Sequence, residues 1–216
     1  MQRPQNGLRP PGAIMERLAV TPGGDESAAA LLHDGDDGGD GDGPVRPVRR
    51  EMDDAAMRRY LTEVGEHLAA RGLTGEIVLA GGAVMVMALK TRGGSSDIDA
   101  VFGLEAEALR QAVREVADAN GLPSTWLNDH VRIFVAADAP TVDLFAVPGL
   151  MVRMVRLDYL FYMQAWAGDP VDQRDLRAIA KALAVKDEHE AFDIVRHYSS
   201  GELSREVQIL LESLFE

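Results

Sequence analysis

The chain has 216 residues, of which 46% are hydrophobic and 26% charged, a composition typical of a soluble globular protein. Cysteine is absent, which excludes a disulfide framework and a thiolate zinc site and fits a reducing compartment. The formal net charge of -13 makes the surface as a whole repel phosphate backbones, so a nucleic-acid substrate would need a local basic patch or a basic partner. No apolar run approaches the ~20 residues of a membrane-spanning helix, and residues 1–12 lack the apolar core of a secretory signal. We therefore expect a cytoplasmic protein with no membrane partner.

Residues 1–50 differ from the remainder because they are rich in Gly, Pro and Asp and show no long apolar periodicity. The tract 34–43 alternates Asp and Gly as a calcium loop does, but Val45 stands where an EF-hand loop carries its last ligand, a glutamate. We interpret residues 1–50 as a disordered acidic tail. Met52 lies where the regular pattern begins and is a candidate alternative start, so a chain beginning there is expected to fold as well as the full chain.

Residues 51–156 are predicted to form an α/β core. Helices are indicated by apolar residues at helical spacing, and strands by short apolar or alternating runs. The pattern predicts helices over 53–71, 83–90 and 104–119, strands over 76–80, 97–102, 131–135 and 141–147, and a strand or extended connection over 151–156. Strands 131–135 and 141–147 are too close for a helical crossover, so we expect them to be neighbours in a mixed sheet.

Residues 157–216 are predicted to form a helical C-terminal unit packed on this core. Four stretches carry the helical pattern, over 157–167, 172–184, 188–198 and 203–215. The predicted fold class is therefore α/β (α+β), with a mixed sheet, flanking helices and a helical C-terminal unit.

The triplet Asp97-Ile98-Asp99 places two acids in alternation at the start of a predicted strand. In a strand, residues i and i+2 point to the same face, so both carboxylates project together while Ile98 is buried on the other side. Two like charges held so close raise each other's pKa unless a cation neutralises them. Mg²⁺, or Mn²⁺, is suited to this because it takes oxygen ligands and keeps positions for substrate phosphates. An isolated Asp-x-Asp is more often a pair of solvated acids than a metal site, so the surrounding sequence is needed to distinguish the two.

Gly81 and Gly82 follow a predicted strand and open the next helix. Glycines at such a point let the backbone approach a phosphate closely, and the helix N-terminus directs amide groups toward it. On its own, such a pair is more commonly a tight turn. Arg92, Ser95 and Ser96 lie just before the two acids and could bind phosphate oxygens. The order strand, Gly-Gly, short helix, Ser and Asp-Ile-Asp is more specific than any of its pieces.

Two later stretches offer further candidates. A third acid is expected from an adjacent strand, and Asp143, in the sequence Val-Asp-Leu-Phe, offers one. With three carboxylates, two metal ions could hold the attacking and leaving oxygens, and Asp143 could also take the proton of an acceptor. An exposed strand residue is an equally good interpretation of Asp143. Trp126 is predicted to be a packing residue, whereas Asn128 and Asp129 either line the site or cap a turn.

The order of these pieces resembles the nucleotidyltransferase superfamily, whose motif is a hydrophobic residue with Gly-Gly or Gly-Ser, a short helix, Asp-hydrophobic-Asp and a later single acid. Within it, the chain is similar to the abortive-infection type of bacterial nucleotidyltransferase toxins and to a related uncharacterised group. The similarity extends over residues 53–198 and is concentrated in 79–83, 92–99, 122–129 and 155–176. The resemblance implies a nucleotidyltransferase-like sheet with a metal and nucleotide site at the two glycines and the two acids.

One position departs from the group that the chain resembles. In that group the helix after the last strand usually carries a Met-Lys pair, whose lysine contacts a nucleotide phosphate, and here the second residue is Gln164. A glutamine can donate a hydrogen bond but brings no charge to a triphosphate. The downstream acid of the group corresponds to Asp172 or Asp175, of which Asp175 fits better. Lys90 or Arg92 could supply the missing charge.

The expected activity is metal-dependent transfer of a nucleoside monophosphate from a nucleoside triphosphate to an acceptor hydroxyl, with pyrophosphate leaving. By resemblance, acceptors include tRNA ends and protein side chains, and the protein could belong to a toxin–antitoxin pair with a cognate antitoxin or regulatory partner. The acidic surface disfavours a large nucleic acid as acceptor. The alternative is a nucleotidyltransferase-fold binding or regulatory protein without turnover. Gln164 and the acidic surface favour this alternative, whereas the intact Asp-Ile-Asp favours the enzyme.

Overall fold

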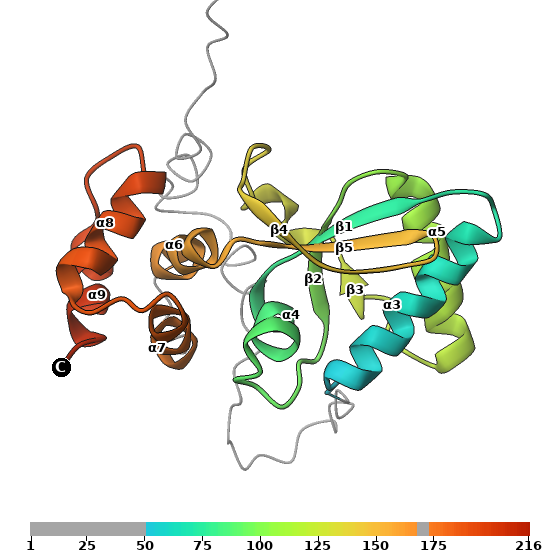
Figure 1. Ribbon diagram of the computed structural model, residues 1–216, viewed down its shortest axis with the longest axis horizontal. Coiled ribbons are helices and arrows are strands. Elements are labelled where there is room, and N and C mark those ends of the chain that lie inside the picture. The colour runs from blue at the N-terminus through green and yellow to red at the C-terminus, as the bar shows by residue number, and fades with distance from the viewer. Residues whose placement is uncertain (1–50, 168–172) are drawn as a thin grey trace, which may run out of the picture. The chain divides into compact units, whose positions relative to one another are not determined.

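The computed structural model describes residues 51–167 and 173–216 (Figure 1). The predicted acidic tail over 1–50 and the candidate acid Asp172 lie outside these residues. Within the two described ranges, no helix has the length and apolarity that crossing a membrane requires.

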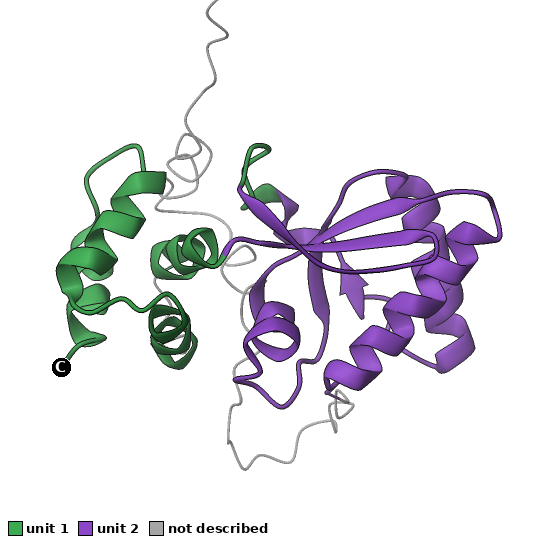
Figure 2. Cartoon of the chain, in the orientation of Figure 1, with its two compact units in different colours: residues 1–23, 133–139, 157–216 green, residues 24–132, 140–156 purple. Residues whose placement is uncertain are grey.

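Two compact units make up the described chain, and Figure 2 colours them separately. One contains every strand of the sheet and the helices that flank it, and the other is helical. The sheet unit comprises residues 51–132 and 140–156, and the helical unit comprises residues 133–139, 157–167 and 173–216.

The sheet unit is built on a five-stranded mixed sheet with the strand order β3-β2-β1-β5-β4. Its strands are β1 (Gly75–Leu79), β2 (Ile98–Phe102), β3 (Leu127–Asn128), β4 (Thr141–Val147) and β5 (Leu150–Val155). β1 pairs antiparallel with β2 and parallel with β5, β3 runs parallel to β2, and β4 runs antiparallel to β5. The predicted combination of helices with a mixed sheet is therefore confirmed.

The predicted strand over 131–135 and its pairing with 141–147 are wrong. Residues His130–Ile133 form a short 3-10 helix instead. β4 pairs with β5 through the two-residue turn Pro148-Gly149, in which Gly149 has a φ of 76°. A proline followed by a residue with positive φ is the preferred composition of a type II turn. The local turn therefore decides the partner of 141–147.

One face of the sheet is covered by α3 (Asp54–Ala69) and α5 (Ala106–Asn120), which pack on each other and on β5 and β1 respectively. Side chains on this face, such as Ile77, Leu79 and Ile98, are fully buried. Because side chains alternate along a strand, the intervening residues point to the opposite face, where Val78 and Asp99 are partly exposed. The acid of β2 therefore projects away from the two helices.

A short helical segment joins β1 to the loop before β2. It begins as α4 (Gly81–Val84), continues as one π-helical turn over Met85–Leu89, and ends at Lys90, whose φ of 57° lies in the left-handed region. Its apolar residues Ala83 and Val84 are buried, and α4 packs against β2. The segment therefore holds the Gly81-Gly82 pair beside the strand that carries Asp99.

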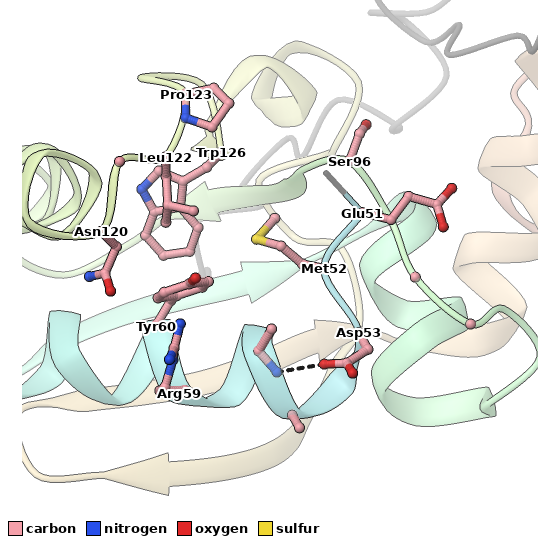
Figure 3. Close-up of a pocket in the computed structure, with 15 residues that line it drawn as sticks. Glu51, Met52, Asp53, Arg59, Tyr60, Ser96, Asn120, Leu122, Pro123 and Trp126 are labelled. Carbon is pink, nitrogen blue, oxygen red and sulfur yellow. Dashed lines mark hydrogen bonds between the residues drawn. The ribbon is translucent and has the colours of Figure 1, made fainter. Parts of the chain in front are cut away.

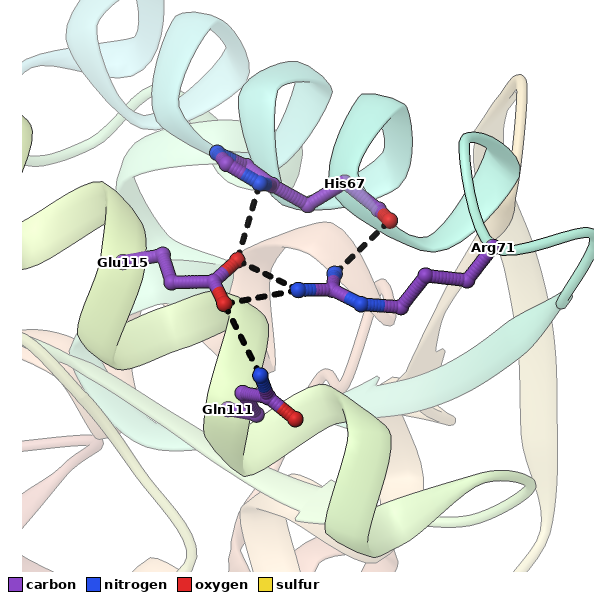
Figure 4. Close-up of polar contacts among 4 residues, drawn as sticks. All are labelled: His67, Arg71, Gln111 and Glu115. Carbon is purple, nitrogen blue, oxygen red and sulfur yellow. Dashed lines mark hydrogen bonds and ion pairs between the residues drawn. The ribbon is translucent and has the colours of Figure 1, made fainter.

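An ion-pair cluster at Glu115 ties α3 to α5 on the surface of the sheet unit (Figure 4). Arg71 donates from Nη2 to both carboxylate oxygens, at 2.6 and 2.7 Å. His67 Nδ1 lies 2.9 Å from Glu115 Oε2, and Gln111 donates to Oε1 at 3.0 Å. These contacts, led by the hydrogen bond from Arg71, lower the pKa of Glu115.

We predict that the variant E115Q is less sensitive to acid than the wild type. A carboxyl whose pKa is lower in the folded protein stabilises the fold above its unfolded pKa, and this contribution is lost as the pH falls through the folded pKa. The difference in Tm between wild type and E115Q should therefore shrink as the pH falls below about 4.5. Thermal melts across a pH series measure it, and a constant difference in Tm at all pH values would contradict the prediction.

The helical unit contains α6 (Leu157–Ala167), α7 (Gln173–Ala182), α8 (Glu188–Tyr198) and α9 (Arg205–Ser213). A buried tyrosine cluster forms part of its core, with Tyr159 and Tyr198 rings in edge contact at a centroid distance of 5.1 Å. The Tyr198 hydroxyl donates to Asp158 Oδ2 at 2.8 Å, and the Tyr159 hydroxyl accepts from the Ala136 amide at 3.0 Å. These bonds give two buried hydroxyls a partner, as a low-dielectric core requires.

Candidate functional site

Asp97 and Asp99 stand at the start of β2. Asp97 directly precedes the strand and Asp99 is its second residue, while Ile98 between them is fully buried toward the helices. Burial first, and then the charge of Asp97, raise the pKa of Asp99 to about 6, against the opposing effects of the Asn128 amide and the His130 charge. The two carboxylates thus lie close enough for the charge of Asp97 to raise the pKa of Asp99.

The backbone of Gly81 and Gly82 passes close to these acids. A Cβ on Gly81 would lie 3.4 Å from Asp99 Oδ2, and Gly81 has a φ of 58°, which a side chain would strain. A Cβ on Gly82 would lie 2.9 Å from Ser95 Oγ, which is closer than real Cβ contacts allow. The Ala80 amide also donates to the Asp99 carbonyl at 3.0 Å. Glycine at both positions therefore keeps the space between the acids and residues 92–96, which we call the serine loop, free of side chains.

The loop before β2 adds polar groups to the same place. Ser95 is fixed by two backbone hydrogen bonds with Met52, of 2.8 and 3.1 Å. The Ser96 hydroxyl donates to Asp97 Oδ1 at 3.3 Å. Arg92 Nη1 would lie 3.5 Å from a Cβ on Gly82. The predicted candidates Gly81, Gly82, Arg92, Ser95, Ser96, Asp97 and Asp99 are thus brought together by the structure.

Lys90 is directed elsewhere. Its Nζ lies 2.6 Å from Asp54 Oδ2 in the first turn of α3. Arg58, one turn later, donates to the other oxygen of Asp54 at 2.9 Å. Of the two residues that could supply the charge missing at Gln164, Arg92 is therefore the one that lies at the Gly82 edge of the site.

Asn128 is the site residue whose role the sequence left open. It lies on β3, the strand next to β2, and is buried. Its Oδ1 accepts from the His130 amide at 3.1 Å, which fixes the orientation of the side-chain amide. Its Nδ2 therefore faces the acids and donates to Asp97 Oδ2 at 3.3 Å. Asp129, the other open candidate, accepts from Arg110 at 2.6 Å and is a tether between β3 and α5.

Asp143 is not brought to the acid pair. It lies on β4, which β1 and β5 separate from β2, so three strand spacings, roughly 14 Å, lie between the two strands. Its side chain is 76% exposed and accepts from Arg153 Nε at 2.9 Å. The expectation that Asp143 comes from a strand adjacent to β2 is therefore not met. The two neighbours of β2 in the sheet are β1 and β3, and β3 carries Asn128.

Gln164 and Asp175 belong to the helical unit, on α6 and α7, which pack together. Both are buried, with 9% and 3% of their surfaces exposed. In the described part of the chain, Gln164 Oε1 is buried without a hydrogen-bond donor. Their predicted contact with nucleotide stays a prediction.

The donor set at β2 fits one hard divalent ion. Mg²⁺ is commonly held by one or two carboxylates, with water and substrate phosphates in the remaining positions. Asp97 and Asp99 supply the two carboxylates. Asn128 directs its side-chain NH₂ group, and not its oxygen, toward Asp97, because the oxygen accepts from the His130 amide. Among residues 51–167 and 173–216, no group of three His, Cys, Asp or Glu side chains is placed to hold a metal ion.

Comparison of the chain with protein-family models, curated proteins and solved structures found no match.

Proposed function

We propose that the protein binds a nucleoside triphosphate together with Mg²⁺ or Mn²⁺ at Asp97 and Asp99, and transfers the nucleoside monophosphate to an acceptor hydroxyl. The observation that carries the proposal is the pair of adjacent carboxylates beside Gly81 and Gly82, with the Asp99 pKa raised to about 6. A pair of adjacent carboxylates next to space kept by glycine is suited to a cation and its phosphate ligands.

In the proposed reaction the acceptor oxygen forms a bond to the α-phosphorus of the nucleotide. The bond from the α-phosphorus to the oxygen that bridges it to the β-phosphorus breaks, pyrophosphate leaves, and the hydroxyl proton passes to water. A bound divalent ion supplies charge neutralisation to the triphosphate. Asp97 and Asp99 hold that ion, and Gly81 and Gly82 leave room for the phosphate oxygens.

Three polar side chains of the serine loop are proposed to orient the triphosphate. The hydroxyl of Ser95 or Ser96 donates to a phosphate oxygen, and the Arg92 guanidinium adds positive charge. Gln164 and Asp175 remain nucleotide contacts proposed from the resemblance alone. Asp143 has no part in this proposal, because it is exposed, paired with Arg153 and on a strand remote from β2.

The second candidate function is nucleotide binding without turnover, as part of a regulatory or toxin–antitoxin pair. It is favoured by Asn128, which occupies the strand next to β2 and directs an amide donor at Asp97 where a third carboxylate would otherwise stand. Gln164, in place of a lysine, favours it as well. Under either function the acidic chain, with a net charge of -13, suits a protein or small-molecule partner better than tRNA.

Incubation with each labelled nucleoside triphosphate, Mg²⁺ or Mn²⁺, and either total tRNA or cell lysate tests the transfer. We expect the rate of label transfer to fall at least about 100-fold in D97N and in D99N, because each substitution removes charge from the ion site. D143N is the matched control and should keep full transfer, since Asp143 lies outside the site. Metal-dependent nucleotide binding without transfer would establish the second function, and the absence of both would overturn the proposal.

A further inference from the structure

A pocket of about 720 Å³ opens in the sheet unit beside the N-terminal end of α3 (Figure 3). Its walls come from the residues before α3, the first turns of α3, the serine loop and the loop after α5. The volume lies within the range of small-molecule sites, roughly 300 to 1,000 Å³. Met52, Leu122 and Pro123 give the pocket apolar sides, while Glu51 and Tyr60 give it polar groups.

Tyr60 is held rigidly in the wall of this pocket. Its side chain is 9% exposed, its ring meets the Trp126 ring in an edge contact at 5.6 Å, and the Arg59 guanidinium lies 4.4 Å from its centroid. No residue of the described chain makes a hydrogen bond to the Tyr60 hydroxyl. The Tyr60 hydroxyl is therefore available to form a hydrogen bond with a molecule in the pocket.

The charge on the pocket wall is negative. The Glu51 carboxylate makes no ion pair or hydrogen bond with any residue in the described ranges. Asp53 caps α3 by accepting from the Ala56 amide at 2.8 Å, which offsets the positive end of that helix. Among the described wall residues Arg59 is the cation, and it is stacked on Tyr60 with its Nε 3.9 Å from Glu63 Oε1. Among the described wall residues the carboxylates therefore outnumber the cations, which favours a cationic ligand over an anionic one.

We infer that this pocket binds a small amphipathic cation that carries a hydrogen-bonding group. The cationic end pairs with Glu51, the apolar body packs against Met52, Leu122 and Pro123, and the polar group bonds the Tyr60 hydroxyl. In the view of Figure 3 the Met52 side chain lies between Glu51 and Tyr60, as this arrangement requires.

The pocket is a second site and does not depend on the proposed transfer reaction. None of its walls is formed by Asp97, Asp99 or Gly81. The link between the two sites is Ser96, which lines the pocket and donates to Asp97 at 3.3 Å. Ligand binding in the pocket can therefore be measured without nucleotide or divalent ion.

The chain offers its own fluorescent reporter for the test. It has two tryptophans, Trp126 at the pocket and Trp166 on α6, so the full-length W166F protein reports Trp126 alone. The probe is tyramine, which joins an ammonium group to an aromatic ring and a hydroxyl. Its counterpart is 4-hydroxyphenylacetate, which carries a carboxylate in place of the amine. We expect tyramine to change the emission saturably and to bind at least roughly tenfold more tightly than the anion, which is about 1.4 kcal/mol.

Two conservative variants, made in the W166F background, identify the groups responsible. Y60F removes the hydroxyl and keeps the ring, so tyramine affinity should fall roughly tenfold. E51Q should abolish the preference for tyramine over the anion. Y162F is the matched control, because it removes a buried hydroxyl that does not line the pocket and should leave binding unchanged. Absence of saturable binding, equal or tighter binding of the anion, or unaltered binding by Y60F and E51Q would each overturn the inference.

Discussion

Replacement of Gly149 by alanine is expected to lower the free energy of unfolding by about 3–5 kcal/mol. Gly149 lies in the β4–β5 turn with a φ of 76°, and its Cα is close to the backbone of α3. An added Cβ would overlap the Gly65 carbonyl oxygen and lie 2.6 Å from the Ala69 backbone nitrogen. Both atoms belong to the backbone of a helix, so neither can move away as a flexible side chain would. The turn or the helix must shift as a whole.

Gly72 provides the matched control for this prediction. It follows α3, has a φ of 70°, and would place a Cβ with nothing within 4 Å. G72A should therefore cost about 1 kcal/mol from backbone strain alone. G65A tests the contact from the other side, since its Cβ would lie 2.8 Å from Val147 Cγ2 and closer still to the Pro148 carbonyl oxygen. Urea unfolding of the three variants gives the comparison, and equal losses in G149A and G72A would contradict the close approach of turn and helix.

The fold was predictable where local pattern decides structure. The predicted ranges 141–147, 157–167 and 188–198 coincide with β4, α6 and α8. Local signals mark two of these boundaries, since β4 ends at the Pro148-Gly149 turn and α8 begins at the Asp187 cap. The run over 131–135 has the apolar composition of a strand but forms no sheet pairing. β3 has two residues, too few for any periodicity, and exists because the Ile98 amide donates to the Trp126 carbonyl at 2.8 Å. Such pairing is set by tertiary contacts, which composition does not encode.

The candidate site also has a part set by local sequence and a part set by tertiary contacts. Its glycines, serines and paired acids are contiguous in sequence between the end of β1 and the start of β2, so one local β–α–loop–β segment carries them. Asn128 and Asp143 lie on other strands, and their distance from Asp99 depends on strand order. The order β3-β2-β1-β5-β4 puts Asn128 beside the acids and Asp143 three strands away. Both Asn128 and Asp143 carried suitable side chains, and the sequence holds no local signal that ranks one above the other.

Replacement of Asp99 by asparagine is expected to stabilise the metal-free protein at neutral pH and to leave it almost unchanged in acid. The folded-state pKa of Asp99 is raised from 3.8 to about 6, chiefly by burial and then by Asp97. A carboxyl with a raised folded pKa favours the fold while it is protonated, and this contribution is lost as the pH rises from the unfolded value through the folded one. The wild type therefore loses stability between pH 3.8 and about 6, whereas D99N has no proton to lose there.

The expected gain of D99N above pH 6 follows from the size of that shift. A rise of about two pH units corresponds to roughly 3 kcal/mol at 1.36 kcal/mol per unit, which solvent screening of this partly exposed group reduces. Urea unfolding of wild type and D99N across a pH series measures the gain, and D143N, with an exposed carboxylate, should differ from wild type by less than about 0.5 kcal/mol throughout. Saturating Mg²⁺ should remove the difference in stability between D99N and wild type. A ligand that binds the native state stabilises it, and only the wild type keeps both carboxylates to bind the ion. A gain that is the same at every pH would mean that Asp99 is not held near Asp97 in a site of raised pKa. A gain that Mg²⁺ leaves unchanged would separate the electrostatics of the pair from metal binding, and would count against the proposed ion site.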